Sequence, residues 1–389
     1  MTILLITLAL FVLYLFYERG DLERLRKSVP LIIAVTGTRG KSTVVRLLAS
    51  VLRESGRIVL AKSTGSQAQY VLPDGSIERV PRRGLVSILE QKDALRKAVK
   101  LKADCLVIET MSIRPENHIV ESQRILKPDI VVLTNIRKDH TEAMGEQENE
   151  IAQVLQLDFA DGSRVYLPKE YEHYLDPKII ENQHLSLTVV PANQDNTPVG
   201  SQSALSKNEF AENLDLVNAV SKALNIEHDV IAGGIRNAKH DIGRFKIWTL
   251  QLNGKRVFAA NAFAANDPES TMKVLARMNE LLGSSARPIT GLLNLRADRP
   301  DRTLQWIDAL NSGLKGKFTR LYVLGGHANV VKRKVDAMNI LASKPPNVLT
   351  NMIAETMEED GVLFGFGNIG GAGEGLIEFW QREGKEHGI

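Results

Sequence analysis

Short apolar runs alternate with helical patterns along this chain of 389 residues, and that alternation restricts its fold more than any other feature. In the first part of the chain the apolar runs are LIIAVT, RIVLAK, DCLVIE and DIVVLTN. Helical patterns over residues 41–54, 88–100 and 116–126 separate them. Such an order is typical of parallel strands whose faces are covered by helices. The sequence therefore predicts an α/β domain here.

A second alternation starts near Lys255. Its apolar runs are RVFAAN, PITGLLN, RLYVLG and GVLFGFG, and a helical pattern follows each of them, the last one running through Trp380. A chain of this length suits two or three domains. We therefore place the boundary between two α/β domains close to Gln251.

Three parts are thus expected. Residues 1–27 form an apolar anchor with a basic segment, residues 28–250 form the first α/β domain, and residues 251–389 form a smaller Rossmann-like α/β domain. The polar stretch over residues 191–207 predicts a loop or an excursion at the edge of the first domain.

The N-terminal run ILLITLALFVLYLFY, residues 3–17, is uncharged and mostly apolar. At about 1.5 Å per helical residue it falls a few ångströms short of a roughly 30 Å hydrocarbon core, so it is a minimal membrane span. It lacks the flanking signals of a cleaved signal peptide, which favours a retained anchor. The basic residues that follow predict that the rest of the chain is cytoplasmic; they are Arg19, Arg24, Arg26 and Lys27. A buried or interfacial helix is the alternative.

Composition excludes several classes of protein. Apolar residues at 43% and charged residues at 24% are the mixture of a folded globular protein. A formal charge of +3 is too small to indicate nucleic-acid binding, and the basic stretches are not interleaved with aromatic residues. The single cysteine, Cys105, has no partner for an internal disulfide, and its apolar surroundings place it in the core. We expect no nucleic-acid partner.

A glycine-containing loop between the first strand and the first helix is the clearest functional feature. Glycines let the backbone turn tightly and aim N–H groups at phosphate oxygens, and the helix presents its positive end to the same anion. The lysine of such a loop supplies a cation to the β and γ phosphates, and the next hydroxyl is a hard oxygen ligand for Mg²⁺. The residues that we expect to bind ATP here are Gly37, Thr38, Arg39, Gly40, Lys41, Ser42 and Thr43.

This loop departs from the full pattern G-x-x-x-x-G-K-[ST], because Val35 stands where the first glycine is expected. The short pattern GxxGKS alone is a weak signal. Its position between an apolar strand and an amphipathic helix is the context that supports ATP binding.

The loop GTRGKST resembles the GTNGKTT loop of the Mur ligase superfamily, whose members form amides through acyl phosphates. Glu109 in VIETMS is similar to the magnesium-binding glutamate of that superfamily. The segment TNIRKDH resembles its N-[IV]-x-x-D-H segment, whose histidine holds a second Mg²⁺; here that segment contains Asn135, Asp139 and His140. The resemblance implies Lys41, Glu109 and His140 as catalytic residues, with Ser42, Glu109 and His140 as metal ligands.

Three further residues match nucleotide contacts of related enzymes. Asn213 in AENLDL is similar to an adenine-contacting asparagine, and Arg244 in IGRF is similar to an arginine that contacts the nucleotide. The stretch AANDPES resembles the HNPES stretch of folylpolyglutamate synthases, with Asn266 where the histidine stands. The resemblance implies that all three contact ATP.

A narrower resemblance covers both domains. The segments TGTRGKST, AFAAND, LRADRPDRT and GFGNIGGAGEGLIE are similar to those of the membrane-anchored ligase subunit of poly-γ-glutamate capsule synthesis. This resemblance implies a Mur-ligase-like central P-loop ATPase domain with a parallel sheet, followed by the Rossmann-like domain and preceded by the anchor helix. It also implies ATP and Mg²⁺ as cofactors, glutamate and a polyglutamate chain as substrates, and small membrane subunits as partners at the cytoplasmic face of the cell membrane.

Two departures from the superfamily matter. Mur ligases and folylpolyglutamate synthases carry a carbamylated lysine that bridges magnesium, but the corresponding stretch here, IAQVLQLDFADGS, has no lysine. We therefore expect the second metal to be held differently. Only 36 residues precede Gly37, which leaves no room for the UDP-sugar domain of cell-wall members, so we do not expect a UDP-linked substrate.

Amide formation from a carboxylate is uphill in water, and transfer of a γ-phosphoryl group gives an acyl phosphate that an amine can attack. Because a carboxylate and a triphosphate are both anions, the site must supply cations and positioning. Lys41 and a Mg²⁺ ion on Ser42 and Glu109 meet that need. For His140 the alternative is a structural histidine, and the polar residues beside it favour the ligand role.

Two arginine-rich segments are candidate contacts for an acidic substrate. Arg79, Arg82 and Arg83 form a cationic loop, for which a solvated surface loop is an equal alternative. The second segment follows a strand of the second domain, where α/β proteins keep ligand contacts, although a surface cluster of ion pairs is the alternative; it contains Arg296, Asp298, Arg299, Asp301 and Arg302. The glycine-rich turn GFGNIGG, residues 365–371, also follows a strand and has either a ligand or a packing role.

The sequence thus predicts an ATP-dependent amide ligase that adds glutamate to a γ-linked polymer. One alternative is a folylpolyglutamate-type synthase, against which the anchor and the segment RADR argue. Another is a membrane-associated P-loop ATPase that ligates nothing and has no need of Glu109 or His140.

Overall fold

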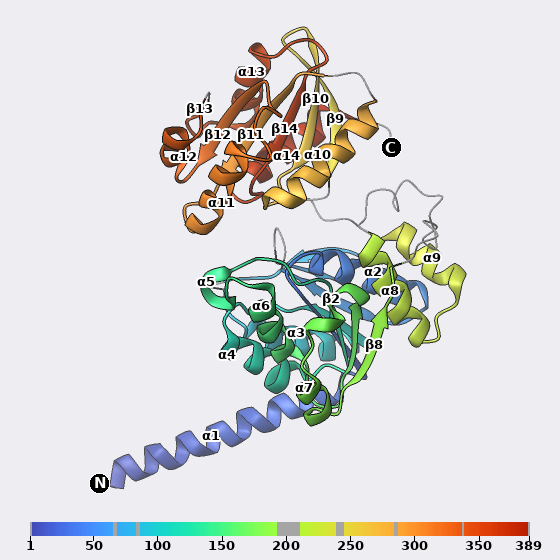
Figure 1. Ribbon diagram of the computed structural model, residues 1–389. Coiled ribbons are helices and arrows are strands. Elements are labelled where there is room, and N and C mark those ends of the chain that lie inside the picture. Colours follow the sequence, from blue (N-terminus) through green and yellow to red (C-terminus); the bar gives the residue numbers. More distant parts are fainter. Residues whose placement is uncertain are drawn as a thin grey trace. The chain divides into compact units, whose positions relative to one another are not determined.

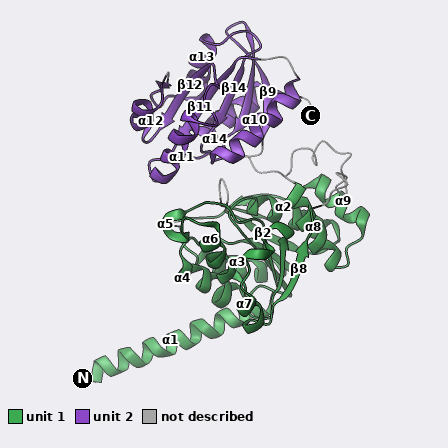
Figure 2. Ribbon diagram, in the orientation of Figure 1, with its two compact units in different colours: residues 1–240 green, residues 241–389 purple. Residues whose placement is uncertain are grey.

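The computed structural model describes residues 2–64, 68–82, 86–192, 211–238, 245–283, 287–336 and 338–387. The chain divides into two compact units, residues 1–240 and 241–389 (Figure 2), and each is described by itself. The expected boundary near Gln251 falls inside strand β9 (Lys246–Leu252), which pairs with β10 (Lys255–Ala262) in the sheet of the second unit. Most of the polar stretch over residues 191–207 lies outside the described residues.

A sheet forms the centre of the first unit (Figure 1). It has eight strands, in the order β4-β3-β2-β5-β1-β6-β7-β8. The six strands from β2 to β8 in this order run parallel, whereas β3 and β4 form an antiparallel edge. The bounds are β1 (Leu31–Thr36), β2 (Val59–Ser63), β3 (Gln69–Val71), β4 (Ile77–Arg79), β5 (Cys105–Glu109), β6 (Ile130–Leu133), β7 (Arg164–Pro168) and β8 (Ser186–Val190).

Helices cover both faces of this sheet, which is why its central strands are continuous apolar runs. On one face α2 packs with α8 and α9 against β1 and β5, and on the other face α3 and η1 pack against the same strands. The bounds are α2 (Lys41–Glu54), α3 (Glu90–Lys100), α4 (Pro115–His118), the π-helix η1 (Ile119–Leu126), α5 (Thr141–Met144), α6 (Glu148–Leu155), the 3₁₀ turns η2 (Gln156–Asp158) and η3 (Lys169–Tyr174), α7 (Pro177–Asn182), α8 (Ala211–Ala223) and α9 (His228–Asn237).

The second unit is built on a seven-stranded sheet in the order β13-β12-β11-β14-β10-β9-β15. Its strands from β13 to β10 are parallel, and β9 and β15 are antiparallel additions at one edge. The further bounds are β11 (Ile289–Leu295), β12 (Arg320–Gly325), β13 (Met338–Ile340), β14 (Val362–Phe366), β15 (Lys385–Glu386), α10 (Pro268–Leu282), α11 (Pro300–Asn311), α12 (Ala328–Lys334), α13 (Pro346–Glu355) and α14 (Ala372–Glu383).

Two apolar clusters lie on the two faces of this second sheet. Helices α10, α11 and α12 bury Met278, Trp306 and Val331 on one face, and α13 and α14 bury Ile353 and Trp380 on the other. The expected α/β fold of both parts of the chain is confirmed, and α2 has the bounds that its sequence pattern predicts.

Helix α1 (Thr2–Lys27) is one continuous helix of 26 residues. The apolar side chains of its first half are exposed, and by length and composition the helix can cross a membrane. Its last turns are attached to the first unit, because Leu22 and Leu25 pack on an apolar cluster and Arg26 pairs with Asp129 at 2.8 Å. The apolar run and the basic segment belong to this single helix.

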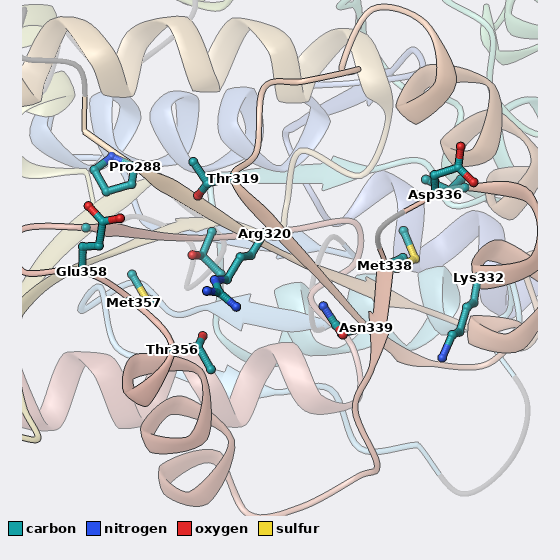
Figure 3. Close-up of a pocket in the computed structure, with 13 residues that line it drawn as sticks. Pro288, Thr319, Arg320, Lys332, Asp336, Met338, Asn339, Thr356, Met357 and Glu358 are labelled. Carbon is teal, nitrogen blue, oxygen red and sulfur yellow. The ribbon is translucent and has the colours of Figure 1, made fainter.

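A pocket of about 680 Å³ lies in the second unit (Figure 3). Its walls include Thr290, Arg320, Met338 and Gly361, which stand at or just before the beginnings of β11, β12, β13 and β14. Ligands of parallel α/β sheets bind at the opposite, carboxyl ends of the strands. This pocket contains none of the residues that the sequence predicts for substrate binding.

Candidate nucleotide and metal site

The glycine-containing loop joins β1 to α2 at the carboxyl edge of the first sheet. Gly37 has φ 119° and Gly40, which precedes the helix, has φ 78°, so both occupy conformations that favour glycine. A Cβ atom on Gly37 would lie 2.3 Å from Thr134 Oγ1, so a side chain at that position would collide. The 14-residue helix α2 then begins at Lys41, and its N-terminal end faces the loop.

Thr134 and Asn135, which follow β6, hold the backbone of this loop. Asn135 Oδ1 accepts hydrogen bonds from Thr38 Oγ1 at 2.7 Å and from the Arg39 N–H at 2.9 Å. Its Nδ2 donates to Arg39 O at 3.0 Å, and Thr134 Oγ1 donates to the same carbonyl at 2.6 Å. The asparagine that matches the superfamily segment therefore fixes the shape of the loop.

Lys41, Ser42 and Glu109 lie where strands β1 and β5 end side by side. Lys41 Nζ donates to Gly37 O at 2.7 Å, which holds the ammonium group over the loop. Ser42 Oγ donates to Glu109 Oε2 at 2.7 Å, and the Thr64 N–H donates to the same carboxylate oxygen at 2.6 Å. Glu109 is only 4% exposed.

A hydroxyl and a carboxylate in direct contact are two hard oxygen donors, which is the donor type that Mg²⁺ prefers. Their position beside a glycine cradle and a lysine fits a magnesium ion that also binds phosphate oxygens. Thr43 follows in the first turn of α2 and is half-buried. The roles of these residues stay predictions that the geometry supports.

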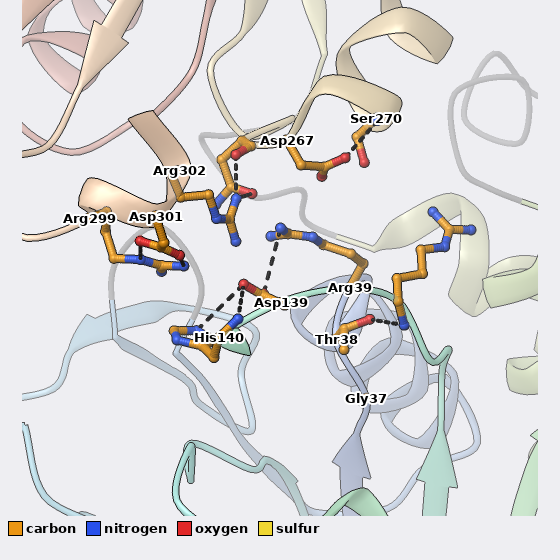
Figure 4. A network of polar contacts seen from close by, with 12 residues as sticks. Gly37, Thr38, Arg39, Asp139, His140, Asp267, Ser270, Arg299, Asp301 and Arg302 are labelled. Atoms are coloured by element: carbon orange, nitrogen blue, oxygen red, sulfur yellow. Dashed lines mark hydrogen bonds and ion pairs between the residues drawn. The ribbon is translucent and has the colours of Figure 1, made fainter. Parts of the chain in front are cut away.

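His140 follows β6, on the other side of β1 from Glu109. It has a left-handed backbone, with φ 47°, and its Nε2 lies 3.8 Å from Asp139 Oδ1 (Figure 4). Asp139 Oδ2 also lies 3.6 Å from the Arg39 guanidinium, so Asp139 connects the histidine to the loop. Within the described ranges, no group of three or more His, Cys, Asp or Glu residues is placed to hold a metal. His140 as a metal ligand therefore stays a prediction.

Asn213 lies next to the loop although it comes from α8, far along the chain. It is 3% exposed, and a Cβ atom on Gly40 would lie 2.7 Å from its Oδ1. The structure thus brings this expected nucleotide contact to the loop. Arg244, the other expected nucleotide contact of this region, lies outside the described residues.

The carboxyl edge of the second sheet carries the remaining candidates. Asn266 follows β10, and Arg302, in the first turn of α11, donates to Asn266 Oδ1 at 2.8 Å. Arg302 is 7% exposed. Asp267 caps α10 by accepting a hydrogen bond from the Ser270 N–H at 2.9 Å. The Asn266 loop is therefore fixed from both sides.

The other arginines are paired within their own segments. Arg296 donates to Asp298 at 2.8 Å, and Arg299 lies 3.1 Å from Asp301. Arg82 donates to Glu90 at 2.8 Å. These contacts leave the predicted substrate role untested. Arg83 lies outside the described residues.

A buried polar cluster behind the loop escaped the sequence analysis. Its charged members are Lys62, His118, Glu121 and Asp158, each at most 1% exposed. Burial raises the pKa of Glu121 and lowers that of Lys62. Burial also opposes the charged form of His118, but Asp158 Oδ1, 2.9 Å from His118 Nδ1, outweighs it and raises the pKa of His118. The spacing of 118, 121 and 122 on one helical face was the available signal.

Two protein families match separate parts of the chain. Residues 35–165 match the Mur ligase middle domain, and residues 247–383 match the C-terminal domain of poly-gamma-glutamate synthase CapB. The first range contains the loop, Glu109 and His140, and the second contains Asn266, Arg296 and Arg299.

Two relatives are similar over nearly the whole chain. PGA synthase CapB of Bacillus subtilis strain 168 is 30% identical, over 97% of this chain and 97% of its own length. Capsule biosynthesis protein CapB of Bacillus anthracis is 28% identical, over 96% of this chain and 81% of its own length. A bifunctional folylpolyglutamate synthase/dihydrofolate synthase of Yersinia pestis, solved with AMPPNP and a manganese ion, has a TM-score of 0.70 and 15% identity over 93% of this chain and 92% of that one. This last similarity shows the fold alone.

Proposed function

This chain belongs to the CapB family of poly-gamma-glutamate synthases, and we propose that it adds glutamate to a growing poly-γ-glutamate chain at the site around Lys41 and Glu109. It is an ATP-dependent amide ligase of Mur-ligase-like architecture. The observation that carries the placement of the site is the hydrogen bond from Ser42 Oγ to Glu109 Oε2, directly beside the phosphate loop.

In the proposed reaction the substrate carboxylate attacks the γ-phosphorus of ATP. The bond from that phosphorus to the bridging oxygen breaks, and ADP and an acyl phosphate result. The amino group of glutamate then attacks the acyl carbon, orthophosphate leaves and an amide bond forms. Lys41 binds the phosphates and offsets their charge, while the N–H groups at the start of α2 face the same oxygens.

Ser42 and Glu109 would hold Mg²⁺, which supplies further charge neutralisation on the phosphates when bound. The stretch over residues 151–163, where the superfamily has its bridging lysine, forms the end of α6, the turn η2 and the approach to β7. It contributes the buried carboxylate of Asp158. None of the steps above depends on a carbamylated lysine.

The acidic polymer needs cations of its own. We assign Arg82, Arg296 and Arg299 to that role, because each is paired with a carboxylate that an acidic ligand can replace. Asn266, held by Arg302, is assigned to the nucleotide.

We further propose that α1 anchors the ligase at the cytoplasmic face of the cell membrane. The exposed apolar half of the helix and the basic residues after it support this location. Small membrane subunits are expected as partners on the basis of the family resemblance. The likeness to folylpolyglutamate synthase supports no folate substrate, because it rests on fold alone.

The test is ADP release by membranes that contain the full chain, supplied in turn with glutamate, with other amino acids, and with glutamate plus a folate acceptor. We expect release that depends on glutamate and needs no folate, with a product whose mass grows by glutamyl residues. Release that requires folate would favour the folylpolyglutamate alternative. Release that is the same without any amino acid would favour a P-loop ATPase that ligates nothing.

A further inference from the structure

The buried polar cluster of the first unit takes no direct part in the proposed phosphoryl transfer. Its members are Thr36, Lys62, Gln91, His118, Glu121, Ser122 and Asp158, and each is at most 1% exposed. Burying charged groups is unfavourable unless hydrogen bonds compensate, and apolar residues of the same size serve stability as well or better. Stability alone therefore does not explain why these charged groups are buried here.

Glu121 holds the backbone that leads away from Glu109. Its Oε1 accepts a hydrogen bond from the Met111 N–H at 2.9 Å, and its Oε2 accepts one from the Ser112 N–H at 2.8 Å. The Ser112 hydroxyl also donates to Oε2. Gln91 Nε2 donates both to Glu121 and, at 3.1 Å, to the carbonyl oxygen of Glu109 itself. One carboxylate thus fixes the strand end that carries the candidate metal ligand.

Asp158 holds the other strand end. It accepts a hydrogen bond from Oγ1 of Thr36, the residue directly before Gly37. It also accepts one from Ser122 Oγ at 2.8 Å, and His118 Nδ1 lies 2.9 Å from its Oδ1. This second carboxylate therefore fixes the point where β1 enters the phosphate loop.

One helical element joins these two arrangements. His118, Glu121 and Ser122 all belong to α4 and η1, which follow each other without a break over residues 115–126. The second part is a π-helix, a rare geometry that occurs frequently at functional sites. Glu121 contacts the backbone just after β5 directly. His118 and Ser122 reach the end of β1 only through Asp158, which accepts the hydrogen bond from Thr36.

We propose that Glu121 and Asp158 are positioning residues, which set the distance between Glu109 and the phosphate loop through the α4–η1 element. The proposal rests on the proposed function, because it assigns the cluster to the same nucleotide and metal site. Neither residue touches the reacting atoms. Partners of metal ligands in this kind of position change metal affinity or activity by about 10- to 100-fold when they are substituted.

The decisive variant is Glu121→Gln in the full chain. Both oxygens of Glu121 accept hydrogen bonds, so an amide would turn one NH₂ group toward a donor of Gln91 or Ser112. We expect the Mg²⁺ concentration for half-maximal binding of a fluorescent ATP analogue to rise by about tenfold. In the absence of metal and nucleotide, we also expect faster hydrogen exchange at the Met111 and Ser112 amides.

Glu116→Gln, an exposed glutamate on α4, is the matched control and should leave both readouts unchanged. Asp158→Asn should weaken binding of the analogue in the absence of Mg²⁺, because Asp158 acts on the loop, with little further change in the Mg²⁺ requirement. Faster amide exchange in Glu121→Gln with an unchanged Mg²⁺ requirement would overturn the proposal and leave a purely structural role. If Glu121→Gln does not fold, Ser112→Ala decides, with the same expectation at a smaller shift.

These readouts do not depend on the identity of the product. If the full chain binds the analogue with Mg²⁺ but adds no glutamate, the proposed function fails and the positioning roles can still be tested. If glutamate is added normally by Glu121→Gln at all Mg²⁺ concentrations, the positioning proposal fails alone.

Discussion

The carboxyl edges of the two parallel sheets carry their charged residues in different ways. In the first unit, Glu121 and Asp158 are buried and their oxygens accept hydrogen bonds from fixed groups. In the second unit, the paired side chains of Arg296 and Asp298 are 48% and 61% exposed. Buried and satisfied charges hold one geometry, whereas exposed pairs contribute little and exchange partners easily. The first edge is thus suited to a fixed reaction, and the second to a flexible acidic ligand.

The largest effect on the rate of ADP release is expected from substitutions at the first edge. Lys41→Ala and Glu109→Ala should each lower glutamate-dependent ADP release by about 100- to 1000-fold, because each removes a group that stabilises charge on the phosphates. Initial rates at saturating ATP measure this. Lys100→Ala, at the exposed C-terminal end of α3, is the control. If ADP release were no slower in Lys41→Ala than in Arg296→Ala, the two edges would not differ in their contribution to the reaction.

A substitution of Arg302 tests whether one buried residue of the second edge holds a fixed geometry, as the buried residues of the first edge do. It is 7% exposed and donates to Asn266 Oδ1, so Arg302→Ala should lower the free energy of unfolding by about 1.5–3 kcal/mol. Denaturant unfolding followed by tryptophan fluorescence reports this unit alone, since Trp248, Trp306 and Trp380 all belong to it. An unchanged midpoint would show that the Asn266 loop is held by other contacts.

The His118–Asp158 pair at the first edge predicts a loss of stability as pH rises. The folded-state pKa of His118 is raised, so the stability from this contact is fully present below the unfolded pKa of about 6.5 and is lost as pH rises through the folded pKa. Each unit by which the folded-state pKa exceeds the unfolded-state pKa corresponds to about 1.4 kcal/mol in the free energy of unfolding. Far-UV circular dichroism of thermal unfolding at several pH values should show the loss, and His118→Gln should remove it. If stability depends on pH with the same slope in His118→Gln, the assignment of this dependence to the His118–Asp158 pair is wrong.

The smallest expected effect concerns the exposed pair. Arg296→Ala should change the free energy of unfolding by less than about 1 kcal/mol, as surface ion pairs do. If Arg296 binds the acidic chain, the same variant should raise KM for a polyglutamate acceptor, with little change in kcat, and the effect should shrink at high salt. Steady-state kinetics at two ionic strengths measure both. A fall in kcat with unchanged KM would instead show that Arg296 acts on the reaction step and not on binding of the acidic chain.

The sequence predicted the parts of this fold that depend on local pattern. The apolar run before Gly37 and the amphipathic pattern from Lys41 gave β1 and α2, and the position of the loop between them followed. Strand β9 was not predicted, because its pairing with β10 depends on the turn at Asn253 and Gly254, and the expected boundary therefore falls inside it. The Asn253–Gly254 turn is the local sequence signal for this pairing.

The site was predicted unevenly for a similar reason. Motif residues such as Lys41 and Glu109 can be found from their spacing, and the structure brings them to one edge. Glu121 and Asp158 were missed, because a glutamate in a helical pattern is usually on the surface, and a shared helical face for residues 118, 121 and 122 is a weak signal. Only the tertiary hydrogen bonds from Met111, Ser112 and Thr36 show that these carboxylates are buried and satisfied.

The most direct test of the ligase assignment is the ratio of ADP released to γ-glutamyl bonds formed. Membranes that contain the full chain would be given ATP, Mg²⁺ and glutamate, with ADP measured enzymatically and the product by mass spectrometry. We expect about one ADP for each glutamate added, because one γ-phosphoryl group activates each carboxylate. We also expect Glu109→Ala to lose ADP release and bond formation together. ADP release without new γ-glutamyl bonds, or bond formation that survives in Glu109→Ala, would contradict the ligase assignment.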